Sequence, residues 1–171
     1  MSHTVGTGSL IGYTKHHTHL KYTEGVVNEI LRLSSTQPLI PRATVPSESG
    51  QVTVGDYTLP SNTPVLINAF SMHRDAAYWK ETAAERFEPS RWINDRGELI
   101  SFRDSYIPFG VGPRSCLGDS LSRMILFLLV ANLVQRFEIS LIDEKDAAAT
   151  NSKIGVMRRT NNYNLKFVAR K

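Results

Sequence analysis

The segment FGVGPRSCLG, residues 109–118, constrains the fold of this chain more than any other part of the sequence. It contains three glycines and the chain's only cysteine, Cys116. The residues after it predict a helix from Leu117 to Arg136. Apolar residues lie nearly all round that helix between Met124 and Ala131, as is typical of a helix buried in a larger body. The segment therefore predicts a tight loop that presents Cys116 at the start of a buried helix.

Two kinds of site fit a glycine-rich loop that precedes a helix. The free N–H groups of a helix start bind phosphate, but phosphate loops usually place Lys, Ser or Thr where this chain has Cys116. The same N–H groups and the helix dipole stabilise a thiolate, the form of cysteine that binds metals. A lone cysteine is more commonly a small buried hydrophobe, so its neighbours decide between these readings. Gly112 and Gly118 leave room for a flat cofactor near the backbone, and Arg114 is placed to bind a carboxylate of that cofactor.

The segment resembles the cysteine-ligand loop of the cytochrome P-450 family. The resemblance implies that Cys116 is the thiolate ligand of the iron in haem b (iron protoporphyrin), that Phe109 packs beside the sulfur, and that Arg114 contacts a haem propionate. A thiolate ligand donates electron density and so favours cleavage of the O–O bond. The resemblance therefore implies a monooxygenase that inserts one oxygen atom from O2 into an apolar organic substrate such as a steroid, fatty acid or xenobiotic. A flavoprotein reductase would supply the electrons.

Two further segments resemble motifs of the same family and occur in its order. Glu29 and Arg32 match the E-x-x-R pair on a predicted helix, although a Glu/Arg pair at this spacing is also common on solvated helix faces. Arg91, within FEPSRW (residues 87–92), matches the arginine of a Pro-x-Arg-aromatic segment. By the resemblance, Glu29, Arg32 and Arg91 form a buried charge triad that fixes the loop holding Cys116.

Weaker expectations concern the flanks of the haem site. The segment TQPLIPRAT, residues 36–44, resembles the strand that runs along the haem edge. There Arg42 would be a second propionate contact, while Leu39 and Ile40 would face the substrate. An ordinary surface arginine after a proline is the alternative for Arg42. Val156 lies in a segment that matches the family's last substrate-contacting loop in position only.

The remaining pattern predicts the organisation of the chain. Residues 1–17 lack periodicity and are expected to form a poorly ordered lead-in, and residues 18–171 a single haem-binding portion. Helices are predicted at Tyr22–Ser34 and, as a helix or a pair of turns, at Ser71–Thr82. Short strands are predicted at Ala43–Pro46, Gln51–Val54, Tyr57–Leu59, Pro64–Asn68, Phe137–Leu141 and Asn164–Val168. The resemblance implies a mainly α fold with a small β component, an incomplete C-terminal part of the cytochrome P-450 fold.

Composition narrows the partners and the location. Hydrophobic residues make up 41% of the chain and charged residues 21%, which is typical of a globular domain. The net charge is +4, but the basic residues are scattered, so binding to nucleic acid is not expected. The longest apolar run, Met124 to Ala131, is far shorter than the ~20 residues that a membrane-spanning helix needs. The sequence looks closest to the animal microsomal branch, which implies the endoplasmic reticulum membrane for the full-length protein, although no anchor is visible here.

Two other functions stay open at this point. The alternatives to the monooxygenase are a truncated, non-catalytic haem-binding fragment and part of a haem-thiolate isomerase or dehydratase, which shares the loop but needs no reductase. No segment resembles the long helix on which oxygen-activating members carry an acid–alcohol pair. We therefore expect that the chain alone is not a working oxygenase.

Overall fold

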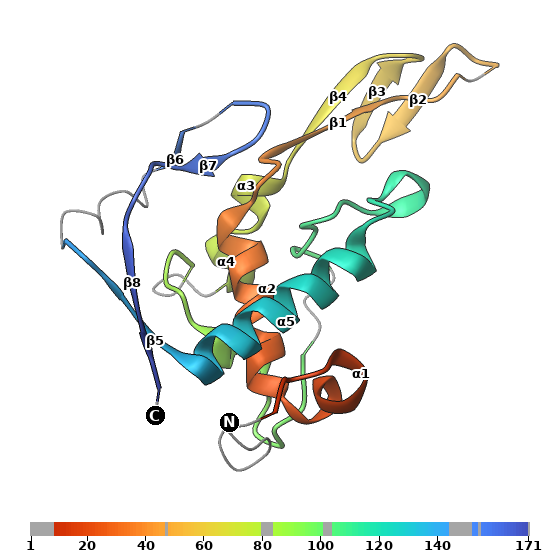
Figure 1. Ribbon diagram of the computed structural model, residues 1–171. Helices are drawn as coiled ribbons and strands as arrows, with labels where there is room; N and C mark the ends of the chain where they lie inside the picture. Colours follow the sequence, from red (N-terminus) through yellow and green to blue (C-terminus); the bar gives the residue numbers. More distant parts are fainter. Residues whose placement is uncertain are drawn as a thin grey trace.

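The computed structural model describes residues 9–46, 48–79, 84–100, 104–143, 152–153 and 155–170. Within these ranges two long helices cross near the middle of the molecule, and small antiparallel sheets lie around them (Figure 1). The helical elements in chain order are α1 (Tyr13–His16), η1 (His17–His19), α2 (Lys21–Ser34), α3 (Ala69–Met72), α4 (Ala76–Trp79), η2 (Pro89–Trp92), η3 (Gly112–Arg114) and α5 (Asp119–Arg136). The strands are β1 (Leu39–Ala43), β2 (Gln51–Val54), β3 (Tyr57–Pro60), β4 (Pro64–Asn68), β5 (Phe137–Leu141), β6 (Ser152–Lys153), β7 (Arg159–Thr160) and β8 (Leu165–Ala169).

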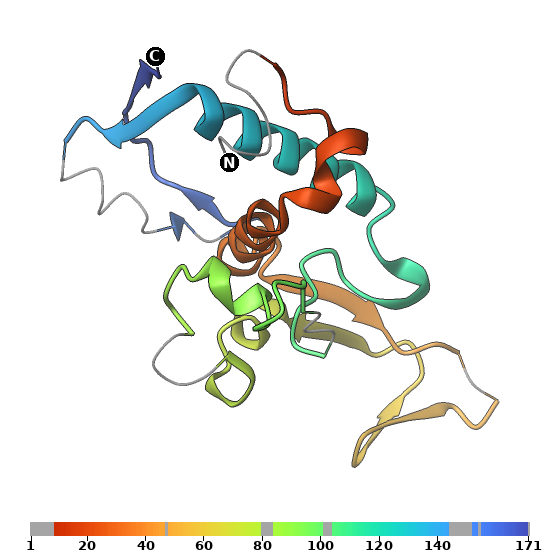
Figure 2. The ribbon, with the colours of Figure 1, turned by 90° about the horizontal axis from the view of Figure 1, so that it is seen from below.

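Helix α2 is the centre of the packing. Its predicted extent is confirmed to within one residue, and it ends at Ser35, whose positive φ of 36° closes the helix through an N–H bond to the Leu31 carbonyl. One face packs on α5 through Val27, Phe127 and related buried residues. The other face approaches η2 so closely at Gly25 that a Cβ there would lie 2.8 Å from the Pro89 carbonyl oxygen. Figure 2 shows η2 beside α2, on the side away from α5.

The part of the expected lead-in that the structure describes packs against the body. Ile11 is 3% exposed and lies in the cluster of Val27 and Phe127. Its backbone N–H and C=O are both bonded by the Asn132 side-chain amide, at 2.9 and 3.0 Å. Contacts of Ile11, Asn132 and Tyr13 therefore hold this segment against the body, and these contacts produce no periodic sequence pattern. Residues 1–8 lie outside the described part of the chain.

All four described sheets are two-stranded and antiparallel: β1–β4, β2–β3, β5–β8 and β6–β7. The predicted strands at β2, β3, β4, β5 and β8 are confirmed to within one residue at each end. The predicted strand Ala43–Pro46 is wrong, because β1 ends at Ala43. Pro41 is tolerated in β1 because that strand pairs on one edge only, with β4. Thr44 then turns the chain, its hydroxyl donating to the Pro60 carbonyl and accepting from the Thr63 amide.

The described chain is a mixture of helices and small sheets, so the expectation of a mainly α fold needs correction. For Ser71–Thr82, predicted as a helix or a pair of turns, the described part has the turns: α3 and α4 are single turns, separated where Asp75 accepts a hydrogen bond from the Ala77 amide. Residues 80–82 of that prediction lie outside the described residues. A second buried cluster contains Ile40, Ala69 and Ile107, and a third contains Trp79, Ala84 and Trp92. The interior is thus divided into three small cores around α2.

Helix α5 begins at Asp119, two residues later than predicted, because Leu117 and Gly118 form a turn. Only Phe127 and Ala131 of α5 are buried. Four apolar side chains at four-residue spacing remain between 37% and 56% exposed and form a stripe along the opposite side: Leu121, Ile125, Leu129 and Leu133. Among the described helices, including α5, none has the length and apolar character needed to cross a membrane.

Candidate functional site

Short backbone hydrogen bonds fold residues 107–118 into a compact loop. The Gly110 amide donates to the Ile107 carbonyl at 3.0 Å, and the Cys116 amide donates to the Phe109 carbonyl at 2.9 Å. Gly110 has a φ of +73°, a conformation that side chains rarely adopt. The loop ends with the Cys116 side chain exposed, three residues before the first residue of α5. The thiol therefore points outward from a hydrogen-bonded turn.

Arg42 crosses this loop from strand β1. Its Nη2 donates to the Arg114 carbonyl at 3.1 Å, and its Nη1 donates to the neighbouring Pro41 carbonyl at 2.8 Å. A Cβ added to Gly110 would lie 3.1 Å from Arg42 Nη2, so glycine gives the guanidinium space to lie over the backbone. The structure thus brings together Arg42 and the Cys116 loop, which the sequence only placed on separate segments. The Arg114 side chain is exposed.

Phe109 stands between the loop and α5. It is half-buried, and the Arg123 guanidinium of α5 lies 5.1 Å from the centre of its ring. Arg123 also donates to Asn28 of α2 at 2.9 Å and lies close to the Tyr106 hydroxyl, at 3.3 Å. Burial raises the pKa of Tyr106 to about 12, although the Arg123 charge opposes the rise. No sequence motif pointed to Arg123, Asn28 or Tyr106, whose contacts connect α2, the loop and α5.

The residues around Cys116 fit a flat iron-containing cofactor better than a bare metal ion. Among the described residues there is no group of three or more His, Cys, Asp or Glu that would hold a metal ion. A single exposed thiol suits an iron whose other ligands come from a macrocycle, as in haem. An added Cβ at Gly112 would meet nothing within 4 Å, and one at Gly118 would make only ordinary contacts with Cys116 and Ser122. No neighbouring protein atom therefore excludes a side chain at either position. The surface beside both glycines is open, and a cofactor would lie there.

Apolar surface flanks the Cys116 side chain. Val111 is 55% exposed, Leu121 is 56% exposed, and Leu117 is exposed completely. Large apolar side chains gathered on a surface mark a place where another apolar body binds. Together with the cations Arg42 and Arg114, these side chains match an apolar ring system that carries anionic groups at its edge. The residues present fit haem.

Glu29, Arg32 and Arg91 lie together in the interior. Arg32 forms a two-pronged pair with the Glu29 carboxylate, at 2.9 and 2.8 Å, and Arg91 Nε donates to the same carboxylate at 3.1 Å. The Glu29 and Arg32 side chains are 0% exposed, and the Arg91 side chain is 8% exposed. The Glu88 amide and the Trp92 indole also donate to Glu29, each at 2.9 Å. Burial raises the pKa of the Glu29 carboxyl, but these donors lower it by more, so its pKa lies below the ordinary value.

Hydrogen bonds through His73, a residue that sequence reasoning missed, connect the triad to the segment before the Cys116 loop. Arg32 Nη1 donates to the carbonyl of His73 at 2.6 Å. His73 is 0% exposed, and its Nε2 accepts the Ile107 N–H at 3.0 Å, two residues before Phe109. His73 therefore connects α2 to the segment that leads into the loop. An isolated histidine carries no motif that would have identified it.

The partners of His73 fix its tautomer. A backbone N–H only donates, so Nε2 is the unprotonated nitrogen and the proton resides on Nδ1. Nδ1 lies 3.0 Å from the Ser35 hydroxyl, which in turn donates to the Arg32 carbonyl at 2.8 Å. Burial lowers the pKa of His73 to about 4, and the charges of Arg74 and Arg32 contribute to the decrease. The imidazole is therefore neutral at physiological pH.

The three residues expected to face the substrate lie in different environments. Leu39 is 45% exposed, and Val156 is 89% exposed in the turn between β6 and β7. Ile40 is 5% exposed and packs with Ala69 and Ile107 inside this chain. Alternation along β1 places Leu39 and Ile40 on opposite faces of the strand, so they do not present one common surface.

Comparison with known proteins identifies the relationship. The family model for Cytochrome P450 matches residues 5–167. The chain is 35% identical over 152 residues to Cytochrome P450 2U1 of Mus musculus, which covers 88% of this chain and 27% of the relative. It is 38% identical over 131 residues to the Steroid 17-alpha-hydroxylase/17,20 lyase of Rattus norvegicus, covering 75% of this chain and 24% of the relative. The corresponding enzyme of Squalus acanthias is 33% identical over 155 residues, covering 90% and 29%. The chain thus spans about a quarter of the length of these relatives, and it belongs to the cytochrome P450 family.

Proposed function

We propose that this chain forms the haem-thiolate part of a monooxygenase that inserts one oxygen atom from O2 into an apolar organic substrate. Steroids, fatty acids and xenobiotics are the substrate classes that we propose. Membership of the family supports the reaction class, and two of the compared relatives are steroid hydroxylases by name. A flavoprotein reductase would provide electrons, and the full-length protein would reside at the endoplasmic reticulum membrane.

The observation that carries the proposal is the exposed thiol of Cys116 on a loop clamped by Arg42. Bound there, haem would supply the chemistry of oxygen activation. Cys116 would hold a negative charge at Sγ as the iron ligand, and the cations Arg42 and Arg114 would bind the propionates. Phe109 would limit the access of water to the sulfur. Glu29, Arg32 and Arg91 would hold the scaffold, with a structural role only.

Substitution of the ligand tests this assignment. The chain is titrated with haemin, reduced, and exposed to carbon monoxide, and the position of the Soret band is recorded. The wild type should give the strongly red-shifted band of a thiolate haem, whereas Cys116→His should give the band of a nitrogen-ligated haem. Ser115→Ala, a change at the exposed neighbouring residue, is the matched control and should behave as the wild type. A thiolate band that persists in Cys116→His would refute the role of Cys116.

One observation favours a second candidate, a haem-binding protein without turnover. An apolar stripe on α5 is exposed in this chain: Leu121, Ile125, Leu129 and Leu133. A stripe of this size is normally covered by another apolar surface. The discriminating measurement adds the reductase and a steroid or fatty acid to the haem-loaded chain. Hydroxylated product that forms in step with NADPH consumption supports the monooxygenase. Haem binding without product supports the second candidate.

A further inference from the structure

A buried imidazole holds the backbone where the chain enters the Cys116 loop. His73 is 0% exposed, and its Nε2 accepts the Ile107 N–H at 3.0 Å. Ile107 is itself 4% exposed, and its side chain packs in a cluster with Ile40 and Ala69. Buried backbone N–H groups are nearly always paired with an acceptor. The bond to His73 therefore determines where the backbone of Ile107 lies.

Two backbone hydrogen bonds relate the cysteine to this point. The Ile107 carbonyl accepts the Gly110 N–H at 3.0 Å, and the Phe109 carbonyl accepts the Cys116 N–H at 2.9 Å. Pro108, between Ile107 and Phe109, has a fixed φ and favours an extended conformation for the residue before it. A displacement of Ile107 would therefore move the carbonyl to which Cys116 is bonded.

The imidazole has little freedom of its own, because neighbouring groups hold both its ring and its backbone. The Ser35 hydroxyl accepts a hydrogen bond from Nδ1 at 3.0 Å and donates to the Arg32 carbonyl at 2.8 Å. Arg32 Nη1 donates to the His73 carbonyl at 2.6 Å, and the His73 N–H donates to the Ala69 carbonyl at 3.0 Å. Helix α2 thus fixes the orientation of the ring that holds Ile107.

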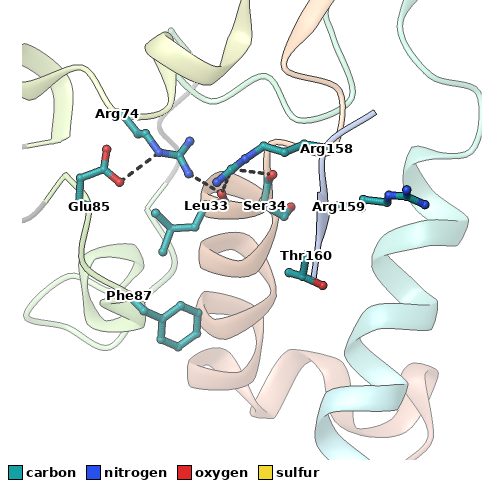
Figure 3. A pocket seen from close by; sticks show the side chains of 8 residues that line it. All are labelled: Leu33, Ser34, Arg74, Glu85, Phe87, Arg158, Arg159 and Thr160. Atoms are coloured by element: carbon teal, nitrogen blue, oxygen red, sulfur yellow. Dashed lines mark hydrogen bonds and ion pairs between the residues drawn. The ribbon is translucent and has the colours of Figure 1, made fainter. Parts of the chain in front are cut away.

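The residue after His73 is bonded to the same helix. Arg74 Nη2 donates to the Leu33 carbonyl at 2.5 Å, and Nη1 donates to the Ser35 hydroxyl at 3.1 Å. Figure 3 shows the Arg74 guanidinium bonded to Leu33 at the C-terminal end of α2. A functional group is held accurately only if the residues around it are themselves locked by packing and hydrogen bonds. The surroundings of His73 meet this requirement.

We propose that His73 is a positioning residue for the thiolate ligand: it holds Ile107 so that Cys116 Sγ lies where it binds the haem iron. The proposal rests on the function proposed above. Groups of a functional site must be held within about 0.5 Å of their working positions. Without the bond to His73, the start of the loop would shift until the Ile107 N–H found another acceptor. Cys116 would then bind the iron less completely, and part of the haem would lack its anionic ligand.

Two substitutions distinguish the roles of the two ring nitrogens. In His73→Gln the side-chain oxygen reaches the place of Nε2 and still accepts the Ile107 N–H. In His73→Asn the shorter amide reaches only the place of Nδ1, which keeps the contact with Ser35 but leaves Ile107 without its acceptor. Ile11→Ala removes a buried side chain from a cluster that contains no residue of the loop, and it controls for a loss of stability alone.

Hydrogen exchange of the haem-free chain, followed by NMR, is the first measurement, and it does not depend on the proposed function. The reference is the amide of Glu29, a buried residue of α2. Relative to it, the Ile107 amide should exchange about tenfold faster in His73→Asn, because a buried donor has lost its acceptor. The ratio should stay at the wild-type value in His73→Gln and in Ile11→Ala. An unchanged ratio in His73→Asn would overturn the proposal.

The second measurement is the share of the reduced, carbon monoxide-bound haem that has the thiolate band. The wild type, His73→Gln and Ile11→Ala should have similar shares, whereas His73→Asn should lose most of its share. A wild type without the band would refute the proposed function and this proposal together. A band that His73→Asn retains in full would refute the role of His73 and leave the proposed function standing.

A third variant keeps the proposal testable if His73→Asn does not fold. Ser35→Ala leaves His73 in place and removes only the hydroxyl that holds Nδ1. The freed ring should hold Ile107 less firmly, so the Ile107 amide should exchange faster and the share of thiolate haem should decrease. If both quantities in Ser35→Ala equalled those of the wild type, the proposal would be wrong.

Discussion

Replacing His73 with glutamine should remove a defined part of the acid sensitivity of this protein. The His73 ring is 0% exposed and accepts the Ile107 N–H through Nε2 at 3.0 Å. Protonation of Nε2 would break this bond and place a third cation beside Arg32 and Arg74. For these reasons the pKa of His73 lies at about 4, compared with 6.5 for an ordinary histidine. Glutamine keeps an acceptor near the position of Nε2 and does not titrate.

The sign of the pH dependence follows from the number of protons that the folded and the unfolded chain bind. Between about pH 4 and pH 6.5 the unfolded chain binds a proton at His73 and the folded chain does not, so the free energy of unfolding decreases as the pH falls. The stabilisation is fully present above pH 6.5 and is lost as the pH falls toward 4. A difference of about 2.5 pKa units corresponds to about 3 kcal/mol, at 1.36 kcal/mol per unit. That is a large part of the stability of a small domain.

Urea unfolding at several pH values, followed by the fluorescence of the buried Trp79 and Trp92, measures this contribution. At neutral pH the variant should be less stable by about 1 kcal/mol, because glutamine replaces only one of the two hydrogen bonds of the imidazole. As the pH falls toward 4 the difference should shrink and then change sign. Comparison of the two proteins cancels other titrating groups, among them Glu24, whose pKa burial raises. His19→Gln, at an exposed histidine, is the control. Parallel stability curves for the wild type and His73→Gln would refute the reasoning.

Three further results are expected. Glu29→Gln removes the carboxylate that pairs with the fully buried Arg32, and one of those that pair with Arg91, so it should lower the free energy of unfolding by about 3–5 kcal/mol. A loss below about 1 kcal/mol in urea titrations would contradict a buried network. Gly25→Ala should destabilise the protein in thermal melts despite the helix preference of alanine, because its Cβ would lie 2.8 Å from the Pro89 carbonyl oxygen, whereas Gly12→Ala, with open space around it, should not. Leu129→Ser, in the exposed apolar stripe of α5, should reduce self-association in sedimentation velocity without lowering the urea midpoint. Unchanged self-association would show that the chains do not associate through this stripe.

The sequence predicted those elements whose pattern is local. Helix α2 was found from apolar residues at three-to-four spacing, β4 is a short apolar run that begins at Pro64, and apolar and polar residues alternate along β5. The start of α5 was misplaced because Leu117 is apolar and looks helical, but it lies in a completely exposed turn. The strand predicted at Ala43–Pro46 was wrong because the restraint comes from pairing with β4, which no local pattern records.

The candidate site shows the same division. The contacts of Glu29 with Arg32 and Arg91 join residues of short motifs, and a motif is readable in a single sequence. The bridge through His73 joins α2 to Ile107, and the contacts of Arg123 join α5 to α2 and to the ring of Phe109. Such links depend on which segments meet in space. A single sequence does not contain that information for isolated polar residues.

The bridge at His73 also has a consequence for the order of folding. The Cys116 loop is tied to α2 by links that join Arg32 to His73 and His73 to Ile107, so the chain must close loops of 41 and 34 residues before the bridge exists. Contacts of long sequence separation form late in folding, because the entropy of loop closure is lost before the contact is made. The turn around Cys116 would therefore acquire its final position among the last parts of the molecule. Haem, bound as proposed, would therefore meet a nearly complete fold.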